Sequence, residues 1–254
     1  MTPNDLPEPE DFQERKPFLD HLEDLRRTLL RSVSALLLGM LIAIPLAPHI
    51  FRLLRWPLEA ATGNVDDYLW TWDFFGGMKI ALQIVFGSGL VFSAPFILYF
   101  VWDFVVPALK RRERAVIKRA FGFAAALFAF GVFIGYRLCL PVAIKAMMGV
   151  GSWIGVRNQW TVTSYMTIAL QLLLAFGLIF ELPVILAILG ALGVIRSSQL
   201  RRFRRHVMVA LVVVAAVLTP DPSIVSQLFM AVPLLVLYEV CIWVIYAMEK
   251  RRAA

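Results

Sequence analysis

The sequence predicts an all-α, polytopic membrane protein with six transmembrane helices. Of the 254 residues, 60% are hydrophobic and only 17% are charged, whereas about 25% of the residues in a soluble domain carry a charge. One soluble core cannot bury so much apolar surface, and the apolar residues gather in separate runs that suit a bilayer. The predicted spans are residues 29–47, 78–101, 120–141, 164–194, 207–219 and 226–246.

The distribution of Lys and Arg predicts how these spans are oriented. Nineteen of the 25 basic residues lie in the N-terminal region, after the second and fourth spans, or at the C-terminus, whereas four lie in the other connections. Because cytoplasmic loops of membrane proteins are enriched in Lys and Arg, both termini are predicted to be cytoplasmic. The net charge of +7 therefore indicates topology rather than nucleic-acid binding.

Three regions are predicted along the chain. Residues 1–17 are acidic and contain prolines, which predicts a disordered tail. Residues 18–248 form the membrane domain, and residues 249–254 form a basic cytoplasmic tail. The domain begins with an amphipathic lead-in predicted to lie on the membrane surface before the first span. The fifth and sixth helices are predicted to be short, and the fifth apolar run is well below the roughly 20 residues that a span needs.

Two carboxylates lie inside predicted spans. Glu181 precedes Pro183 in the fourth span, and a charge at the bilayer centre costs about 2.5–3.5 kcal/mol on insertion scales. It is either a protonated or snorkelling residue on a helix kinked at Pro183, or a polar contact for a partner's transmembrane helix or a water-filled cavity. Glu239, near the basic end of the sixth span, leaves the same two interpretations open.

The motifs of membrane-embedded and nucleotide-hydrolysing enzymes are absent from the sequence. The three histidines, His21, His49 and His206, lie outside the predicted spans, and no His-Glu-x-x-His motif or phosphate-binding loop occurs. Cys139 and Cys241 lie about a hundred residues apart in apolar runs, without metal-ligand spacing. We therefore predict a protein that is not an enzyme, with no catalytic residue, no metal and no cofactor.

Residues 103–119 join the second and third spans and contain six cations. Such a run predicts a cytoplasmic loop. Glu113 lies inside the run, where it is either a salt-bridge partner for its neighbours or part of a recognition site. Asp103 borders the second span and is expected to cap it or to pair with Lys110.

Several short stretches, taken in order, match the pattern of a known family. The lead-in reads His21-Leu22-Glu23-Asp24-Leu25-Arg26. The later stretches are Phe74-Phe75, Ser93-Ala94-Pro95-Phe96, Trp102-x-Phe104-x-x-Pro107, Arg112-Glu113-Arg114, Phe176-Gly177-x-x-Phe180-Glu181-x-Pro183 and Leu218-Thr219-Pro220. In this order, over about residues 18–246, they resemble the TatC family, the receptor subunits of the twin-arginine protein translocase.

The resemblance implies a function in protein transport. It implies a receptor in the plasma (inner) membrane that binds the Arg-pair signal peptides of folded precursor proteins at the cytoplasmic face. It also implies recruitment of single-span partners of the TatA and TatB types, and transport driven by the proton-motive force. A homo-oligomer within the receptor complex, in contact with membrane lipid, is expected, and no nucleic-acid partner.

The resemblance also implies roles for particular residues, carried over position by position. Signal-peptide binding is expected at Asp24, Arg26, Phe74, Phe104 and Glu113. Intramembrane or partner contacts are expected at Glu181, which would face the concave side of the protein, and at Glu239 and Asp221. Structural roles are expected for Pro57, Pro95, Pro107 and Pro183. The chain departs from the family in having Asp24 in place of Glu and in a shifted position of Asp221.

An Arg-pair site also has a physical rationale that is independent of the family. A guanidinium presents a planar fork that a carboxylate accepts in bidentate fashion. Two arginines call for two carboxylates, which Asp24 and Glu113 would supply, and each charged hydrogen bond contributes about 1.5–3 kcal/mol. Glu23 and Arg27, at i and i+4, are predicted to pair with each other.

Two other functions remain compatible with the sequence. One is a proton-coupled small-solute carrier with Glu181 as the proton site. Carriers often contain internal repeats, but residues 29–120 and 164–246 show no convincing one. The other is an assembly scaffold, which would bind partner proteins without any affinity for signal peptides.

Overall fold

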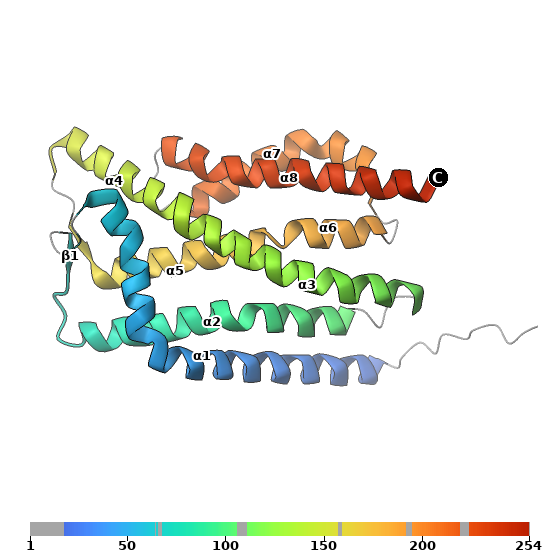
Figure 1. Ribbon diagram of the computed structural model, residues 1–254, viewed down its shortest axis with the longest axis horizontal. Coiled ribbons are helices and arrows are strands. Elements are labelled where there is room, and N and C mark those ends of the chain that lie inside the picture. Colours follow the sequence, from blue (N-terminus) through green and yellow to red (C-terminus); the bar gives the residue numbers. More distant parts are fainter. Residues whose placement is uncertain are drawn as a thin grey trace, which may run out of the picture.

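The protein is an elongated bundle of helices with two distinct ends (Figure 1). The structure is a computed structural model, and it describes residues 18–63, 65, 68–105, 111–156, 159–191, 195–218 and 224–253. The predicted tail of residues 1–17, Pro107 and Asp221 therefore lie outside the described residues. The elements are α1 (Phe18–Thr62), β1 (Leu69–Trp70), α2 (Gly76–Val105), α3 (Arg111–Ile134), η2 (Gly135–Cys139), α4 (Leu140–Ile154), β2 (Trp160–Thr161), α5 (Val162–Ile179), α6 (Leu182–Ala191), α7 (Ser197–Leu218) and α8 (Ile224–Ala253).

The two ends of the bundle differ in chemistry. At one end, which we call the basic end, α1, α3 and α7 begin and α2 and α8 finish, on the right of Figure 1. Arg26, Arg27, Arg201 and Arg202 are exposed there. The opposite end, which we call the aromatic end, carries β1 and β2, which pair in parallel with Leu69 opposite Trp160. This small ladder was not predicted.

Five described segments are long and apolar enough to cross a membrane, which establishes an all-α, multi-pass membrane protein. They are Leu22–Thr62, Gly76–Val101, Gly122–Ile154, Val162–Gly190 and Met230–Lys250. The prediction had a sixth, in α7. This helix has 22 residues, but Arg201, Arg202, Arg204 and Arg205 occupy its first turns. Its apolar part, residues 207–218, therefore extends only about 18 Å at 1.5 Å per residue.

Three predicted boundaries differ from the structure, for identifiable reasons. The lead-in is continuous with the first span in α1, because no helix breaker separates them. The third span does not end at residue 141, since Pro141 lies at the start of α4, where helices tolerate proline. The fourth span, by contrast, agrees with a single apolar segment, Val162–Gly190, which is interrupted between α5 and α6 at the predicted kink. The sixth helix is not short, since α8 has 30 residues, or about 45 Å.

Proline shapes α1, the longest helix. Its 45 residues include Pro45, Pro48 and Pro57, and Figure 1 shows it running beside α2 and then turning across the aromatic end. Each proline lacks the N–H that would bond four residues back. For Pro57 that acceptor is the Leu53 carbonyl, which instead accepts a 2.8 Å hydrogen bond from the Tyr136 hydroxyl. Proline therefore leaves an acceptor free in α1, and η2 supplies the missing donor.

Neighbouring contacts hold the turned part of α1 against the bundle. The Tyr165 hydroxyl of α5 donates a 2.6 Å hydrogen bond to the Leu54 carbonyl. The Arg137 guanidinium lies 4.3 Å from the centre of the Trp56 ring, a distance at which a cation is attracted to an aromatic face. This stacking holds the Arg137 side chain of η2 against the turned part of α1.

The straight part of α1 packs very closely on α2. A Cβ atom added at Gly39 would lie 2.5 Å from the Gly89 carbonyl oxygen, and one at Gly89 would lie 2.8 Å from the Met40 nitrogen. Only glycine permits such an approach of two backbones, a common arrangement between membrane helices. The relative position of α1 and α2 is therefore fixed by backbone shape.

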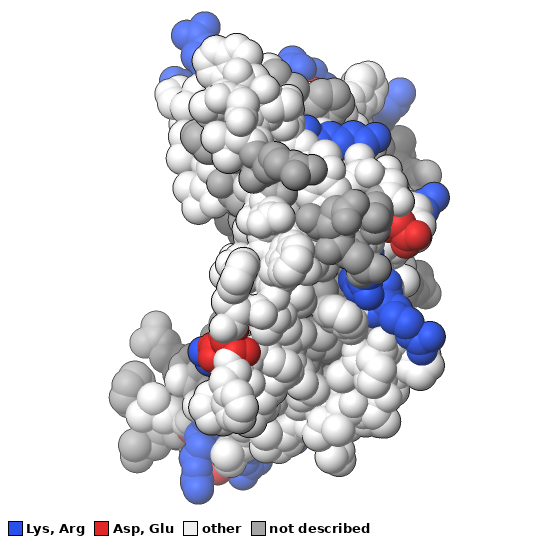
Figure 2. Space-filling view, turned by 90° about the vertical axis from the view of Figure 1, so that its left-hand side faces the viewer, with Lys and Arg blue, Asp and Glu red and all other residues white. Residues whose placement is uncertain are grey.

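The core of the bundle is built around α5. Its buried side chains include Met166, Ala169, Leu172 and Phe176, each at most 1% exposed. They pack against the surrounding helices, chiefly α3 and α2. Seen from the aromatic end, the molecule is hollowed along one side, and uncharged residues cover most of the visible surface (Figure 2).

Candidate functional site at the basic end

The antiparallel course of α1, α2 and α3 brings several predicted site residues to one end of the bundle. Asp24 lies in the second turn of α1, Phe104 is the penultimate residue of α2, and Glu113 is the third residue of α3. All three positions are at the basic end (Figure 1). The chain thus gathers residues that are up to 89 positions apart in the sequence. The side chain of Glu113 lies outside what the structure describes.

Asp24 belongs to the face of α1 that is turned toward α2. Buried or partly buried positions recur along this face at Thr28, Ser32, Gly39 and Ala43, and Asp24 is the partly buried position one turn before Thr28. The Thr28 hydroxyl donates a 2.9 Å hydrogen bond to the Asp24 carbonyl. Residues four apart on a helix share a face, so Asp24 continues the stripe along which α1 packs on α2.

An ion pair joins α1 and α2 at the same end. The Arg31 Nη1 atom lies 3.7 Å from Asp103 Oδ2, which sets Arg31 level with the end of α2. Asp24 precedes Arg31 by seven residues, or nearly two helical turns, so both residues lie on nearly the same face of α1. Asp24 lies about 10 Å from Arg31 along the helix axis, toward the start of α1. This carries it past Val105, the last residue of α2. The alternative partner expected for Asp103, Lys110, lies outside the described residues.

The basic residues beside Asp24 are paired with Glu23. Arg27 Nε lies 3.3 Å from Glu23 Oε1, and Arg26 Nη1 lies 3.5 Å from Glu23 Oε2. The predicted pair between Glu23 and Arg27 is confirmed. Since all three side chains are exposed, each contact contributes at most about 1 kcal/mol. Their effect is electrostatic, because Glu23 offsets part of the positive charge next to Asp24.

Phe74 does not belong to this group. It lies just before α2 begins, at the aromatic end, with 93% of its surface exposed. The 30 residues of α2 separate it from Phe104 by about 45 Å. Phe74 therefore lies far from Asp24 and Phe104, and its expected role in signal-peptide binding stays a prediction. Nearby, a hydrogen bond from Lys79 holds the pKa of Asp73 below its usual range.

Glu181 lies at the break between α5 and α6. Pro183 cannot donate to the Ile179 carbonyl, and the helix is interrupted at Phe180 and Glu181, where the kink was predicted. The Glu181 side chain is only 2% exposed, and neither carboxylate oxygen has a hydrogen-bond partner within the described part of the chain. The carboxylate is therefore not displayed on a concave surface, as the resemblance implied, because the helices around the break enclose it.

Glu239 has a partner within the chain. Its Oε1 atom lies 2.6 Å from Arg204 Nε of α7. Of the predicted structural prolines, Pro57 and Pro183 are buried and Pro95 is partly buried inside α2. Sequence reasoning missed both Arg204 and Arg31 as partners of acidic residues. Neither pair could be inferred from the sequence, because each depends on how two separate helices are rotated about their axes.

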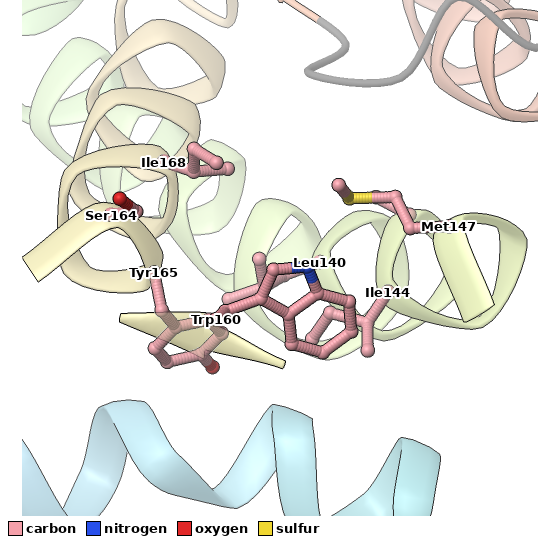
Figure 3. A pocket seen from close by; sticks show the side chains of 8 residues that line it. Leu140, Ile144, Met147, Trp160, Ser164, Tyr165 and Ile168 are labelled. Carbon is pink, nitrogen blue, oxygen red and sulfur yellow. The ribbon is translucent and has the colours of Figure 1, made fainter. Parts of the chain in front are cut away.

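A small apolar pocket lies near the aromatic end, between α4 and α5 (Figure 3). Its lining contains no Asp, Glu, His, Lys or Arg, and the hydroxyl of its one phenol, Tyr165, is bonded to Leu54. The pocket therefore offers no acid–base chemistry. The lining residues are Leu140, Ala143, Ile144, Met147, Trp160, Ser164, Tyr165 and Ile168.

The fold and the site together define a multi-pass membrane protein with acidic side chains among arginines at one end. Within the described ranges, no group of three or more His, Cys, Asp or Glu residues could hold a metal ion. Comparison with known proteins identifies the class further. The chain belongs to the TatC family, since residues 20–233 match the family model described as Sec-independent protein translocase protein (TatC). It is accordingly a non-enzymatic transport protein of Tat translocation.

Relatives and solved structures agree with this assignment. The chain is 34% identical to the Sec-independent protein translocase protein TatC of Carboxydothermus hydrogenoformans, over 91% of this chain and 94% of that protein. It is 35% identical to the TatC of Aquifex aeolicus, over 89% and 93%. A crystal structure of the twin arginine translocase receptor TatC in DDM superposes with a TM-score of 0.77 at 33% identity, covering 88% of this chain and 98% of that one.

Proposed function

We propose that this chain is a receptor for twin-arginine signal peptides at the cytoplasmic face of the plasma membrane. The observation that carries the proposal is the meeting of Asp24, Phe104 and the first turn of α3, which contains Glu113, at the basic end. A solved relative is described as a twin arginine translocase receptor, which supports the same function here.

The proposed topology has six spans and cytoplasmic termini, with α7 as the fifth span. The apolar part of α7 covers only residues 207–218, or about 18 Å against a hydrocarbon core of about 30 Å. The arginines of its first turns would then lie at the inner headgroup level, in agreement with the enrichment of Lys and Arg on the cytoplasmic side. The basic end is the cytoplasmic end in this arrangement.

Recognition of an arginine pair follows from the chemistry of the acidic side chains. A carboxylate can accept two parallel hydrogen bonds from one guanidinium, whereas a lysine ammonium offers no such planar fork. Asp24 and Glu113 would each receive one arginine. The ion pairs of Glu23 with Arg26 and Arg27 lower the repulsion that a dicationic ligand would meet beside Asp24.

The proposed partners are single-span proteins of the TatA and TatB types, with transport drawing on the proton-motive force and the receptor acting as a homo-oligomer. A contact of Glu181 with a polar residue of a partner helix would require the helices that enclose it to separate, and would then satisfy carboxylate oxygens that have no hydrogen-bond partner within the described residues. The same observation favours the second candidate, a proton-coupled carrier. Solute-dependent proton flux in liposomes that contain this chain alone would favour the carrier.

Photo-crosslinking of an Arg-pair peptide to membranes tests the receptor function. Glu113→Ala is expected to reduce crosslinking at least about tenfold, since each charged hydrogen bond contributes about 1.5–3 kcal/mol. Asp24→Ala should reduce it similarly, and protein insertion should be unchanged. Glu59→Ala is the control, because Glu59 is exposed on the turned part of α1. Normal crosslinking in the double variant Asp24→Ala, Glu113→Ala would refute the site.

A further inference from the structure

The ion pair between Arg31 and Asp103 has no evident role in holding the fold together. Its two closest atoms are 3.7 Å apart, and the side chains are 58% and 57% exposed. Exposed pairs of this kind contribute little to stability. The helices that it joins are already fixed by the contact of their backbones at Gly39 and Gly89. The position of the ion pair and its chemistry indicate a role other than stability.

Its place is the candidate site itself. Asp103 precedes Phe104 at the end of α2, and Arg31 lies on nearly the same face of α1 as Asp24. The pair is a guanidinium bound to a carboxylate, which is the chemistry that recognition of an arginine pair requires. The contact runs through one nitrogen and one oxygen, whereas the strongest arginine–carboxylate pairs are bidentate.

We propose that Asp103 is a further arginine-binding carboxylate of the site, and that Arg31 occupies it until a signal-peptide arginine takes its place. The inference rests on the proposed receptor function and adds a residue that determines specificity. Arg31 acts as an internal competitor, so an arginine of the ligand must bind Asp103 more tightly than Arg31 does in order to displace it. A lysine gains less from the exchange, because its ammonium cannot form the bidentate contact.

The spacing of the carboxylates suits two neighbouring arginines. Asp24 lies about 10 Å along the axis from the level at which Arg31 meets Asp103. Successive side chains of an extended peptide point to opposite sides, so the guanidiniums of an Arg-Arg pair can diverge toward two separate carboxylates. Asp103 could therefore serve one arginine while Asp24 or Glu113 serves the other.

Binding of a fluorescent Arg-pair peptide and its Lys-pair counterpart to the full-length protein in nanodiscs tests the proposal. Arg31→Gln removes the competitor, and affinity for the Arg-pair peptide should rise by up to about fivefold, the range expected for one exposed ion pair. Affinity for the Lys-pair peptide should rise less. In the double variant Arg31→Gln, Asp103→Asn the gain should disappear, because the carboxylate is gone.

Two controls separate this mechanism from a general change in charge. Arg27→Gln removes a cation from the next turn of α1, one whose partner, Glu23, lies on the same helix. Lys79→Gln breaks an equally exposed pair at the aromatic end. Neither variant should raise the ratio of Arg-pair to Lys-pair affinity. A gain in Arg27→Gln equal to that in Arg31→Gln would mean that charge alone is responsible, and would overturn the proposal.

The remaining outcomes are also decisive. If Arg31→Gln and Asp103→Asn both weaken binding and the exchange Arg31→Asp, Asp103→Arg restores it, the pair only positions the helices and the proposal is wrong. Unchanged binding in Arg31→Gln also refutes it. The wild-type protein, in the same titration, tests the receptor function separately. If it shows no preference for the Arg-pair peptide, the receptor function fails, and with it the inference.

Discussion

The two hairpins at the edges of the bundle are held together in different ways. In α1–α2, the backbones touch at Gly39 and Gly89, and one exposed ion pair lies at the end. In α7–α8, polar contacts connect the helices along most of their length. They are Ser197 with Glu249, Leu200 with Tyr238, Arg201 with Tyr246, Arg204 with Glu239, and Val212 with Gln227.

The difference shows how each hairpin sets its register. Where two backbones touch this closely, the helices can pack in only one relative position, so α1–α2 is a rigid frame for Asp24 and Phe104. Directional polar pairs also specify a register, but they respond to charge. In addition, α7 packs mainly on α8 and has few other neighbours. We therefore expect the first hairpin to be sensitive to side-chain volume and the second to be sensitive to charge.

The largest effect is expected from added volume in α1–α2. Gly39→Ala places a Cβ atom 2.5 Å from the Gly89 carbonyl oxygen, and overpacking of this kind typically costs about 1–3 kcal/mol. Thermal unfolding in detergent, followed by labelling of the buried thiols of Cys139 and Cys241, would measure the loss.

Gly122→Ala on α3 is the matched control for this prediction. Apart from its chain neighbours and the backbone of its own helix, no atom of the described residues lies within 4 Å of a Cβ added at Gly122, so alanine should be neutral or stabilising by up to about 1 kcal/mol. Equal losses in the two variants would show that close packing between α1 and α2 is not what fixes the first hairpin.

A smaller effect is expected from charge removal in α7–α8. Glu239→Ala leaves Arg204 without its partner on the face of α7 that packs on α8. Because the pair is partly exposed, with side chains 52% and 31% accessible, we expect a cost of about 1 kcal/mol. Thiol labelling of Cys241 in α8 should rise more than labelling of Cys139.

The double variant Arg204→Leu, Glu239→Leu sharpens the test. Replacing both members of an ion pair by apolar residues is often neutral or stabilising. Recovery of stability in the double variant would show that the single substitution acts by leaving a charge unpaired. Continued instability would instead show that this hairpin depends on volume, as the first one does.

The smallest effect is expected at the start of α7. Glu249 of α8 accepts hydrogen bonds from both the backbone N–H and the hydroxyl of Ser197. It therefore caps the N-terminus of α7, although it belongs to a different helix. Glu249→Ala should cost about 1 kcal/mol or less, as the loss of a capping residue does. Lys250→Ala, one residue further on, is the control and should leave the same unfolding temperature unchanged.

The sequence was sufficient to predict the five described segments that are long and apolar enough to cross a membrane, because apolar runs are local features. It predicted the interruption near Pro183 and the pair between Glu23 and Arg27 for the same reason. The position of Phe74 at the opposite end from Asp24 agrees with the predicted spans, because residue 74 lies in the connection between the first two spans. Its expected role in signal-peptide binding stays a prediction.

Contacts between helices could not be predicted in the same way. The pairs formed by Arg31 with Asp103 and by Arg204 with Glu239 depend on the rotation of each helix about its axis. A shift of one residue rotates a side chain by about 100°, and the sequence alone does not define that angle. The bonds from Tyr136 and Tyr165 to α1 are of the same kind, because Pro57 reveals an acceptor without indicating its donor.

The unbroken helical course from Arg111 to Ile154 has a mechanical consequence. Its 44 residues form a rod of about 65 Å that reaches from the first turn of α3 to the tip of α4. Near its middle, η2 attaches the rod to α1 through the Tyr136 hydroxyl. The rod also packs on α5 and on α1 along its length, so it forms a stiff connection between the turn that contains Glu113 at the basic end and α4 at the aromatic end.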